Sequence, residues 1–370
     1  MPACGDIPIN NRPAIAYFVS AHGLGHAARA AAVMAAVHQV APAVRFEIFT
    51  TAPHWFFDDC LAGSFACHLL ETDVGLIQNS PLEENLPATI EALDAFYPLD
   101  ERRVGAAASS VKELGCRAVI CDIAPMGIAV ARRAGLPSVL VENFTWDWIY
   151  AGYTESVHRL KPHIDYLQEL FAAATYHVQA APVCAPGDAD LTVAPIGRAP
   201  RLSADRTRRQ LEMPADKQLV VLTLGGTATS PGRLNLKSLP EDVFLVVPGS
   251  SDRIKRTGRT LRLPTRSGIY HPDLIRAADA VIGKAGYSTL AEIYQADVPF
   301  GCISRALFRE APVLETFTQE ELRSVKVPEA TLQDGSWTAL IPALTALAPS
   351  GGRRGNGASP VAAFIVEILG

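Results

Sequence analysis

Residues 283–292 read GKAGYSTLAE and follow directly on the apolar run Ala280–Ile282. An apolar run, then glycines and hydroxyls, then the helix-like Leu290–Tyr294 predicts a strand, a tight turn and the start of a helix. Backbone N–H groups at a helix start lack partners within the helix and carry partial positive charge, so they bind anions such as phosphate. This stretch therefore predicts an α/β domain with an anion site at the turn.

The side chains of the same stretch suit a nucleotide. Ser288 and Thr289 would add hydroxyl donors to the anion site, and Lys284 would add a cation. Glu292 falls within the first helical turns, where its carboxylate could accept hydrogen bonds from the two hydroxyls of a ribose. An ordinary strand–helix turn that binds nothing is the alternative.

The composition indicates a packed globular protein. The chain has 370 residues, 49% of them hydrophobic and 19% charged, which suits two domains better than one. A net charge of −5 argues against a nucleic-acid partner. Basic residues cluster in residues 201–209 and 253–266, where they could face an anionic ligand or simply be solvated.

The cysteines and the apolar runs bear on localisation. The seven cysteines are scattered, form no Cys-x-x-Cys pair and lie partly in apolar contexts, which favours free thiols in a reducing cytoplasm. The start of the chain lacks a signal-peptide pattern, and no apolar run is long enough to cross a bilayer. We expect a cytoplasmic protein with no transmembrane segment.

Apolar runs alternate with helical spacing along most of the chain, which predicts doubly wound parallel sheets. The predicted strands are Ala14–Ser20, Val44–Thr51, Phe65–Leu70, Arg117–Ile123, Ser138–Glu142, Leu219–Leu224, Val243–Val247, Ala280–Gly283 and Val298–Ile303. The Pro/Gly stretch 195–200 suits a linker between domains.

We therefore expect an α/β protein with two Rossmann-like doubly wound domains that face each other across a cleft. Residues 1–197 form the first domain and residues 198–358 the second, while a last helix, residues 359–370, could pack back on the first. Ligands of open α/β sheets bind beyond the carboxyl ends of the strands. Both glycine-rich loops should then point into the cleft.

The first strand leads into a loop with two histidines and two glycines. Gly23 and Gly25 would let the backbone pass close to a ligand, but the spacing is not the G-x-G-x-x-G of a nicotinamide-binding fold. His26, at the mouth of a strand–loop–helix turn, is placed to be a general base. His22 is the alternative base, or could touch the ligand instead.

A catalytic histidine needs a carboxylate that orients its ring. Asp122 ends the predicted strand that contains Ala118–Cys121, and it would hold one tautomer of His26 and stabilise its protonated form. The alternatives are that His26 bonds only to backbone at a helix start and that Asp122 caps the helix from Met126 onward.

Residues 143–150 read NFTWDWIY and follow a strand directly. Tryptophan rings flanking Asp147 suit sugar recognition, with ring faces against C–H surfaces and the carboxylate against hydroxyls. A plug between domains is the alternative function of this run.

These features together resemble the GT-B superfamily of nucleotide-sugar glycosyltransferases. Residues 286–292 are similar to the Gly-Trp-Asn-Ser-x-x-Glu part of the donor signature in UDP-glycosyltransferases, beginning at Gly286. The match implies phosphate contacts by Ser288 and Thr289 and a ribose contact by Glu292. The signature's histidine is replaced by Lys284, a flexible point charge.

The first domain carries the second half of the resemblance. Gly25-His26 looks like the Gly-His of the loop that holds the catalytic base in these enzymes, and Asp122 falls in a segment similar to that of its partner aspartate. Residues 143–150, 283–292 and 298–312 also resemble the glycosyltransferase-like N-terminal domain of plant L-arabinokinases and related bacterial "predicted glycosyltransferase" proteins, without the kinase part.

The resemblance implies further donor contacts. Where the donor signature ends in an Asp-Gln pair, Glu310 could grip sugar hydroxyls and Arg309 could meet an acidic sugar or a phosphate. Gly226 and Thr227 open the second domain like the loop beside the diphosphate. Tyr270, followed by His271, lies where backbone groups of these enzymes usually pair with the base of the nucleotide.

The resulting expectation is an inverting, metal-independent glycosyltransferase that moves a hexosyl or pentosyl group from a UDP-type nucleotide sugar to an unknown hydroxyl acceptor. No cofactor is expected besides the nucleotide sugar as co-substrate. Asp188 and Asp190 have the spacing of an Asp-x-Asp metal motif, but we interpret them as surface carboxylates and assign no metal motif. A nucleotide-sugar hydrolase of the same fold and a non-catalytic nucleotide-sugar sensor are the alternatives.

Overall fold

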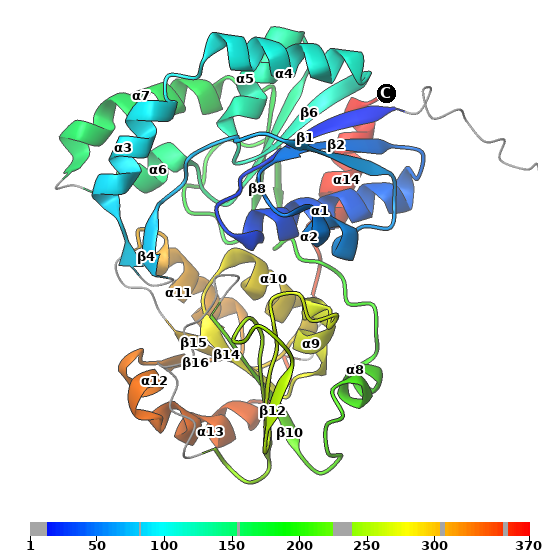
Figure 1. The fold of residues 1–370 in the computed structure, drawn as a ribbon, viewed down its shortest axis with the longest axis vertical. Coiled ribbons are helices and arrows are strands. Elements are labelled where there is room, and N and C mark those ends of the chain that lie inside the picture. The colour runs from blue at the N-terminus through cyan, green and yellow to red at the C-terminus, as the bar shows by residue number, and fades with distance from the viewer. Residues whose placement is uncertain (1–12, 81–82, 154–155, 225–238, 304–307, 351–353) are drawn as a thin grey trace, which may run out of the picture. The chain divides into compact units, whose positions relative to one another are not determined.

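The computed structural model describes residues 13–80, 83–153, 156–224, 239–303, 308–350 and 354–370. These residues divide into two compact units (Figure 1). The described residues of Met1–Ile77, Asn85–Ile196 and Gly357–Gly370 form the first unit, and those of Gln78–Glu84 and Gly197–Asn356 form the second. The short segment Gln78–Glu84 thus belongs to the second unit, although the sequence predicts it within the first domain.

The first unit is built on a parallel sheet in the order β3-β2-β1-β6-β7-β8-β9. Its strands are β1 Ala14–Val19, β2 Arg45–Thr50, β3 Phe65–Leu69, β6 Cys116–Asp122, β7 Ser138–Glu142, β8 Tyr176–Ala180 and β9 Leu191–Val193. Every residue of the central strand β1 is buried. Such burial on both faces explains why the strand reads as a continuous apolar run.

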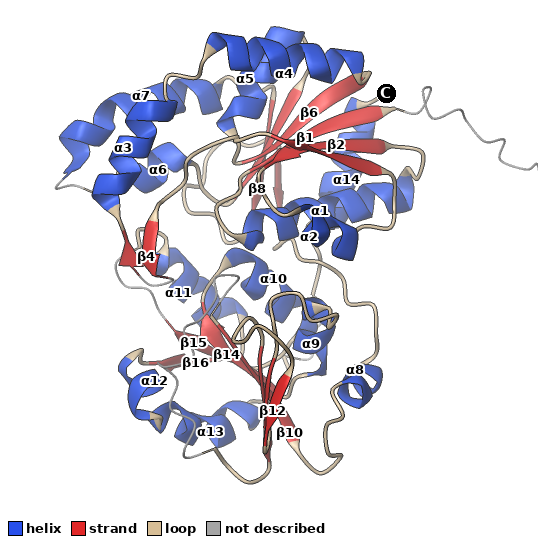
Figure 2. Cartoon of the chain, viewed as in Figure 1, coloured by secondary structure: helices blue, strands red, loops and turns tan. Residues whose placement is uncertain are grey.

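Helices cover both faces of this sheet, with α4 and α5 on one side and α1 and α14 on the other (Figure 2). The helices of the unit are α1 Leu24–Val40, α2 His54–Cys60, α3 Leu86–Phe96, α4 Glu101–Glu113, α5 Pro125–Ala134, α6 Trp146–Tyr150, α7 Val157–Ala172 and α14 Ala358–Ile368. The C-terminal helix α14 packs against α1. Its buried residues recur at helical spacing and form one apolar stripe: Ala358, Val361, Ala362 and Ile365.

The second unit repeats this plan in the order β12-β13-β11-β10-β14-β15-β16. All its strand pairs are parallel except β12 with β13. The strands are β10 Gln218–Thr223, β11 Val243–Val247, β12 Lys255–Thr257, β13 Thr260–Arg262, β14 Ala280–Lys284, β15 Phe300–Ile303 and β16 Ser324–Val327. The helices are α8 Ala204–Gln210, α9 His271–Ala277, α10 Tyr287–Ala296, α11 Ala311–Glu321, α12 Ala330–Asp334 and α13 Ile341–Thr345.

Alternate residues of one strand serve two separate cores in the second unit. Leu219 and Val221 of β10 pack into the core on one face of the sheet, whereas Val220 and Leu222 pack into the core on the other. Successive strand side chains point to opposite faces, so a doubly wound sheet needs apolar residues at every position. The predicted fold class is confirmed in both units.

The predicted strands are all present, with ends that differ by no more than two residues. Several elements were not predicted, among them β8, β9, α7 and the small sheet of β4 Gln78–Ser80 and β5 Glu83–Glu84. Strand β8 escapes the prediction because its sequence YHVQA mixes polar and apolar residues. Pro87 lies in the first turn of α3, where a proline costs no hydrogen bond.

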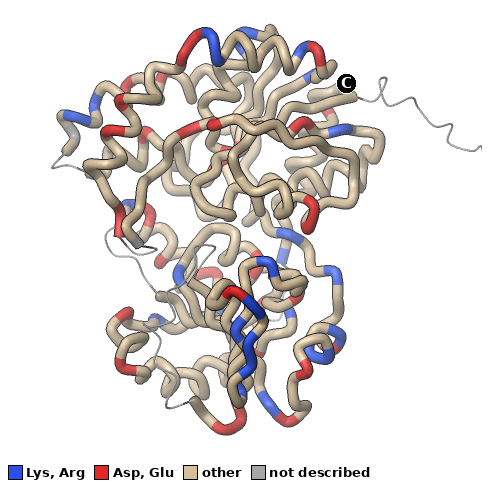
Figure 3. Tube along the Cα trace, in the orientation of Figure 1, with Lys and Arg blue, Asp and Glu red and all other residues tan. Residues whose placement is uncertain are grey.

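Lys and Arg residues gather along β12 and β13 (Figure 3). Every residue of β12 is exposed, so Lys255 and Arg256 are solvated. The ring of Phe244 lies under the Arg256 guanidinium at 5.1 Å. Solvation therefore accounts for these two residues of the basic cluster. No helix in the described ranges is both long and apolar enough to cross a membrane.

Candidate functional site

The loop after β1 and the end of β6 bring His26 and Asp122 together. Strands β1 and β6 are parallel neighbours with Val19 opposite Asp122, so the carboxylate lies where the chain leaves β1 for α1. Helix α1 begins at Leu24, after Gly23 with φ of +75°. His26 therefore lies in the first turn of α1, not in the loop before it as the sequence suggested.

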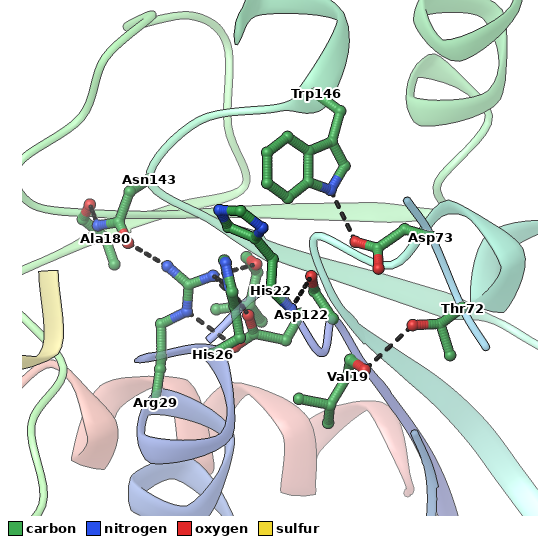
Figure 4. A network of polar contacts seen from close by, with 12 residues as sticks. Val19, His22, His26, Arg29, Thr72, Asp73, Asp122, Asn143, Trp146 and Ala180 are labelled. Atoms are coloured by element: carbon green, nitrogen blue, oxygen red, sulfur yellow. Dashed lines mark hydrogen bonds and ion pairs between the residues drawn. The ribbon is translucent and has the colours of Figure 1, made fainter. Parts of the chain in front are cut away.

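The imidazole of His26 faces the carboxylate of Asp122 (Figure 4). The distance from His26 Nδ1 to Asp122 Oδ1 is 2.9 Å, although the two residues are 96 apart in sequence. Asp122 is fully buried and His26 is 8% exposed. An ionised carboxylate only accepts, so Nδ1 carries the hydrogen and Nε2 keeps its lone pair. This is the tautomer that a general base requires.

Arg29 completes the pair in a way that the sequence did not reveal. Its Nε donates to Asp122 Oδ2 at 2.8 Å and its Nη2 donates to Oδ1 at 2.6 Å. Burial alone would raise the pKa of the Asp122 carboxyl, but the Arg29 charge and the hydrogen bonds from His26 and Arg29 hold that pKa below its usual value. The i, i+3 spacing of His26 and Arg29 on an alanine-rich helix was the available signal.

A second buried carboxylate, Asp73, follows β3 and was also missed. Its Oδ2 accepts a hydrogen bond from Trp146 Nε1 at 2.7 Å. In the same loop, Leu76 N–H donates to His22 Nδ1 at 3.4 Å. Gly75 has φ of +68°, and a Cβ there would lie 2.8 Å from His22 Nδ1, so the close approach of loop and ring requires glycine.

The two histidines thus differ in what their Nδ1 atoms contact. His22 Nδ1 accepts from the backbone, whereas His26 Nδ1 faces a carboxylate. Only the second arrangement fixes Nε2 as the acceptor beside a charge that stabilises the protonated ring. This geometry favours His26 over His22 as the base.

Trp146 does not take part in the open sugar platform that the sequence suggested for the aromatic run. The Trp146 ring is 1% exposed and lies among rings of the first unit. It stacks with Tyr150 at 6.0 Å and meets His22 edge-on at 5.2 Å. Buried among these rings, Trp146 supports the histidine loop rather than a sugar.

Asp73 should make stability depend on pH. Burial raises the pKa of Asp73 from 3.8 to about 6. Its folded pKa lies above its unfolded one, so its contribution favours folding at low pH and is lost as the pH rises through about 6. At pH 7 the raised pKa of Asp73 lowers the free energy of unfolding by about 3 kcal/mol. We expect Asp73→Asn to gain stability over the parent as the pH rises from 4.5 to 7.5, by about 2–3 kcal/mol at the upper end.

Urea unfolding at a series of pH values measures this difference. Asp165→Asn is the matched control, because Asp165 is an exposed carboxylate on α7 that pairs with Lys161 in the same helix. The free energy of unfolding of this control should equal that of the parent at every pH. A constant difference for Asp73→Asn across the range would contradict the assignment.

In the second unit, the predicted strand–turn–helix is confirmed. Strand β14 ends at Lys284 and α10 begins at Tyr287, with Gly286 as its N-cap residue. Ser288 and Thr289 lie half-buried in the first turn, and Lys284 is half-buried at the end of β14. Gly286 has no side chain that could cap the first-turn N–H groups. The turn therefore has the features of an anion site.

Glu292 lies buried in α10 and holds two partners from its own unit. Its Oε1 accepts from Arg198 Nε at 2.9 Å and Nη2 at 2.8 Å, and its Oε2 lies 2.6 Å from His271 Nδ1. Burial alone would raise the pKa of Glu292, but the charges of Arg198 and His271 hold it below its usual value. A ribose would have to share these oxygens. Arg198 is the one charged residue of the 195–200 linker, and this was the sequence feature that could have indicated the ion pair.

The other expected ligand contacts are spread over both units. Tyr270 is the N-cap residue of α9, and the Arg201 guanidinium lies over its ring at 4.1 Å. Arg309 and the buried Glu310 lie at the start of α11. Gly25 lies in the first turn of α1. Gly226 and Thr227 lie outside the described residues.

Comparison with solved structures identifies the architecture. The chain matches MurG of Acinetobacter baumannii with a TM-score of 0.54 and 16% identity, covering 96% of this chain and 99% of that one. It matches UGT71G1 of Medicago truncatula, solved in complex with UDP-glucose, with a TM-score of 0.62 and 13% identity, covering 98% and 99%. The chain has the GT-B fold.

The amino-acid sequence of the chain is also similar to that of a plant protein. The chain is 28% identical over 362 residues to L-arabinokinase of Arabidopsis thaliana, covering 95% of this chain and 34% of the relative. It thus spans about a third of that protein's length. No protein-family model matches the chain. In the described part of the chain, no three His, Cys, Asp or Glu side chains are grouped so as to hold a metal ion.

Proposed function

We propose that this protein is an inverting glycosyltransferase that moves a sugar from a UDP-type nucleotide sugar to a hydroxyl acceptor. The observation that carries the proposal is the buried pair of His26 and Asp122 at the carboxyl end of the first sheet. Its tautomer leaves Nε2 as a proton acceptor. Solved structures that share the fold, among them two glycosyltransferases and one protein in complex with UDP-glucose, support the same chemistry.

The proposed reaction begins at His26. Its Nε2 takes the proton of the acceptor hydroxyl as that oxygen attacks the anomeric carbon. The bond from this carbon to the diphosphate oxygen breaks on the opposite face, so the configuration inverts. The Asp122 carboxylate stabilises the imidazolium that forms, and general-base help of this kind contributes about 10²–10⁴ in rate.

The donor half of the proposal rests on the second unit. The N-terminus of α10 and Lys284 would stabilise the negative charge of the departing diphosphate. Because they would do so without a metal ion, we propose a metal-independent reaction. Ser288 and Thr289 would contact the phosphates, and Glu292 the ribose. The sugar transferred would be a hexosyl or pentosyl group.

We also place the protein in the cytoplasm. The six cysteines of the described ranges are free thiols, and five of them are buried. Free thiols persist in a reducing compartment.

The test is calorimetric titration of the full chain with UDP, dTDP, GDP, CMP and UDP-sugars, followed by product analysis. We expect UDP to bind, and Glu292→Gln to weaken that binding by tenfold or more, because the amide cannot replace the carboxylate. Glu320→Gln, on the exposed face of α11, is the matched control.

The outcomes separate the alternatives. Transfer to an added hydroxyl compound supports the proposal, and free sugar in plain buffer would replace it with hydrolysis. Binding without turnover under any condition would replace it with a sensor. Failure of every nucleotide to bind would remove the donor half altogether.

A further inference from the structure

One side chain that the proposed reaction does not use is tied more tightly to Asp122 than the base itself. We propose that Arg29 is a positioning residue: it holds the Asp122 carboxylate in place and offsets part of its charge, so that His26 Nε2 remains available to accept a proton. This inference rests on the proposed function for its consequence in turnover. Its geometric part stands independently of any substrate.

The guanidinium of Arg29 grips the carboxylate with two donors. Nε lies 2.8 Å from Oδ2, and Nη2 lies 2.6 Å from Oδ1. Oδ1 also receives His26 Nδ1 at 2.9 Å, and Arg29 Nη2 lies 3.5 Å from that nitrogen. One carboxylate oxygen therefore bridges the imidazole and a permanent cation. A two-pronged arginine contact fixes both the position and the plane of a carboxylate.

Arg29 is itself anchored by an adjoining strand end (Figure 4). Its Nη1 donates to Asn143 Oδ1, just after β7. The amide nitrogen of Asn143 donates to the carbonyl oxygen of Ala180 at 2.6 Å and of Pro182 at 3.3 Å. Because these carbonyls can only accept, the amide oxygen must face Arg29. Arg29 is 5% exposed, so this network holds the guanidinium away from solvent.

The charges around His26 show what Arg29 does. The titratable groups near the His26–Asp122 pair come from several elements: Tyr17 on β1, His22 before α1, Arg29 on α1, Asp73 after β3, Asp122 on β6 and Glu142 on β7. Arg29 is the permanent cation of this set. Without it His26 would face an uncompensated buried carboxylate, which favours the imidazolium. An imidazolium cannot accept the acceptor's proton.

The competing explanation is that Arg29 only satisfies a buried carboxylate and supports the fold. Both explanations predict a loss of stability when Arg29 is removed. They differ in the titration of His26, which only an electrostatic role would move. A pH titration followed on the His26 ring therefore decides between them.

The experiment is nuclear magnetic resonance of the full chain with ¹⁵N-labelled imidazoles, with His26 assigned from the spectrum of His26→Ala. Arg29→Met and Arg29→Gln remove the charge, and Arg29→Lys keeps it while losing the planar fork. The two neutral variants guard against one of them failing to fold. Arg132→Met, at an exposed position in the last turn of α5, is the matched control.

We expect the titration midpoint of His26 to rise by one pH unit or more in each neutral variant that folds, and to change by less than half a unit in Arg29→Lys and Arg132→Met. The acidic limb of the pH–rate profile should rise by the same amount. An unchanged midpoint in a folded neutral variant would overturn the inference.

The two proposals fail separately. A raised midpoint with no turnover of any donor would keep the role of Arg29 and reject the transferase. Turnover with an unmoved midpoint would keep the transferase and reject the role of Arg29.

Discussion

Replacing His26 by alanine is expected to lower turnover of the nucleotide sugar by about 10²–10⁴-fold and to leave its binding unchanged. The variant removes Nε2, the lone pair that would take the acceptor's proton. The predicted donor contacts, from Lys284 to Glu292, lie in the second unit and are untouched. The loss should therefore fall on kcat, with the calorimetric affinity for UDP within about twofold of the parent.

Two further variants make this result specific. His22→Ala tests the alternative base, and we expect a smaller loss because its Nδ1 accepts from the Leu76 backbone rather than facing a carboxylate. His158→Ala, exposed on α7, should behave like the parent. Full activity in His26→Ala together with inactivity in His22→Ala would reassign the base. Full activity in both would reject a histidine base.

The second large effect should follow from Asp122→Ala. We expect the free energy of unfolding to fall by about 3–5 kcal/mol, because the change leaves Arg29 buried without its carboxylate. The cost arises from the uncompensated cation as much as from the lost hydrogen bonds, since both charges lie in the interior. Urea unfolding of the parent and the variant measures it.

A double-mutant cycle isolates the cause. Adding Arg29→Met to Asp122→Ala should restore part of the lost stability, because an apolar side chain then replaces the stranded cation. Asp165→Ala is the surface control and should cost less than about 1 kcal/mol. A loss below about 1 kcal/mol for Asp122→Ala, or a double variant that is simply the sum of the singles, would show that the ion pair contributes little.

The strand–turn–helix at residues 280–296 shows what local sequence can predict. An apolar run, a glycine-rich turn and a helical pattern each depend on neighbours a few residues away, and β14 and α10 follow that pattern. The two doubly wound sheets were predictable for the same reason. Strand β8 was not, because its mixed sequence carries no clear period.

The partners of the site residues could not be predicted in this way. Arg29 reaches Asp122 from 93 residues away, and Arg198 reaches Glu292 from 94. The residues near Asp122 in sequence do not predict that it contacts a buried guanidinium. The prediction for Trp146 was wrong for a related reason, since only the packed loop after β3 shows that its indole donates inward to Asp73.

The sequence by itself determined the fold class, the strand ends at which polar side chains gather, and the candidate pair of His26 and Asp122, because apolar periodicity and glycine turns act over short distances. The tertiary structure alone decided which charges meet. Parallel strands bring their carboxyl ends to one edge whatever the length of chain between them, and burial there forces each charge to find a partner. The four-residue network of His26, Asp122, Arg29 and Asn143 is the result of that packing.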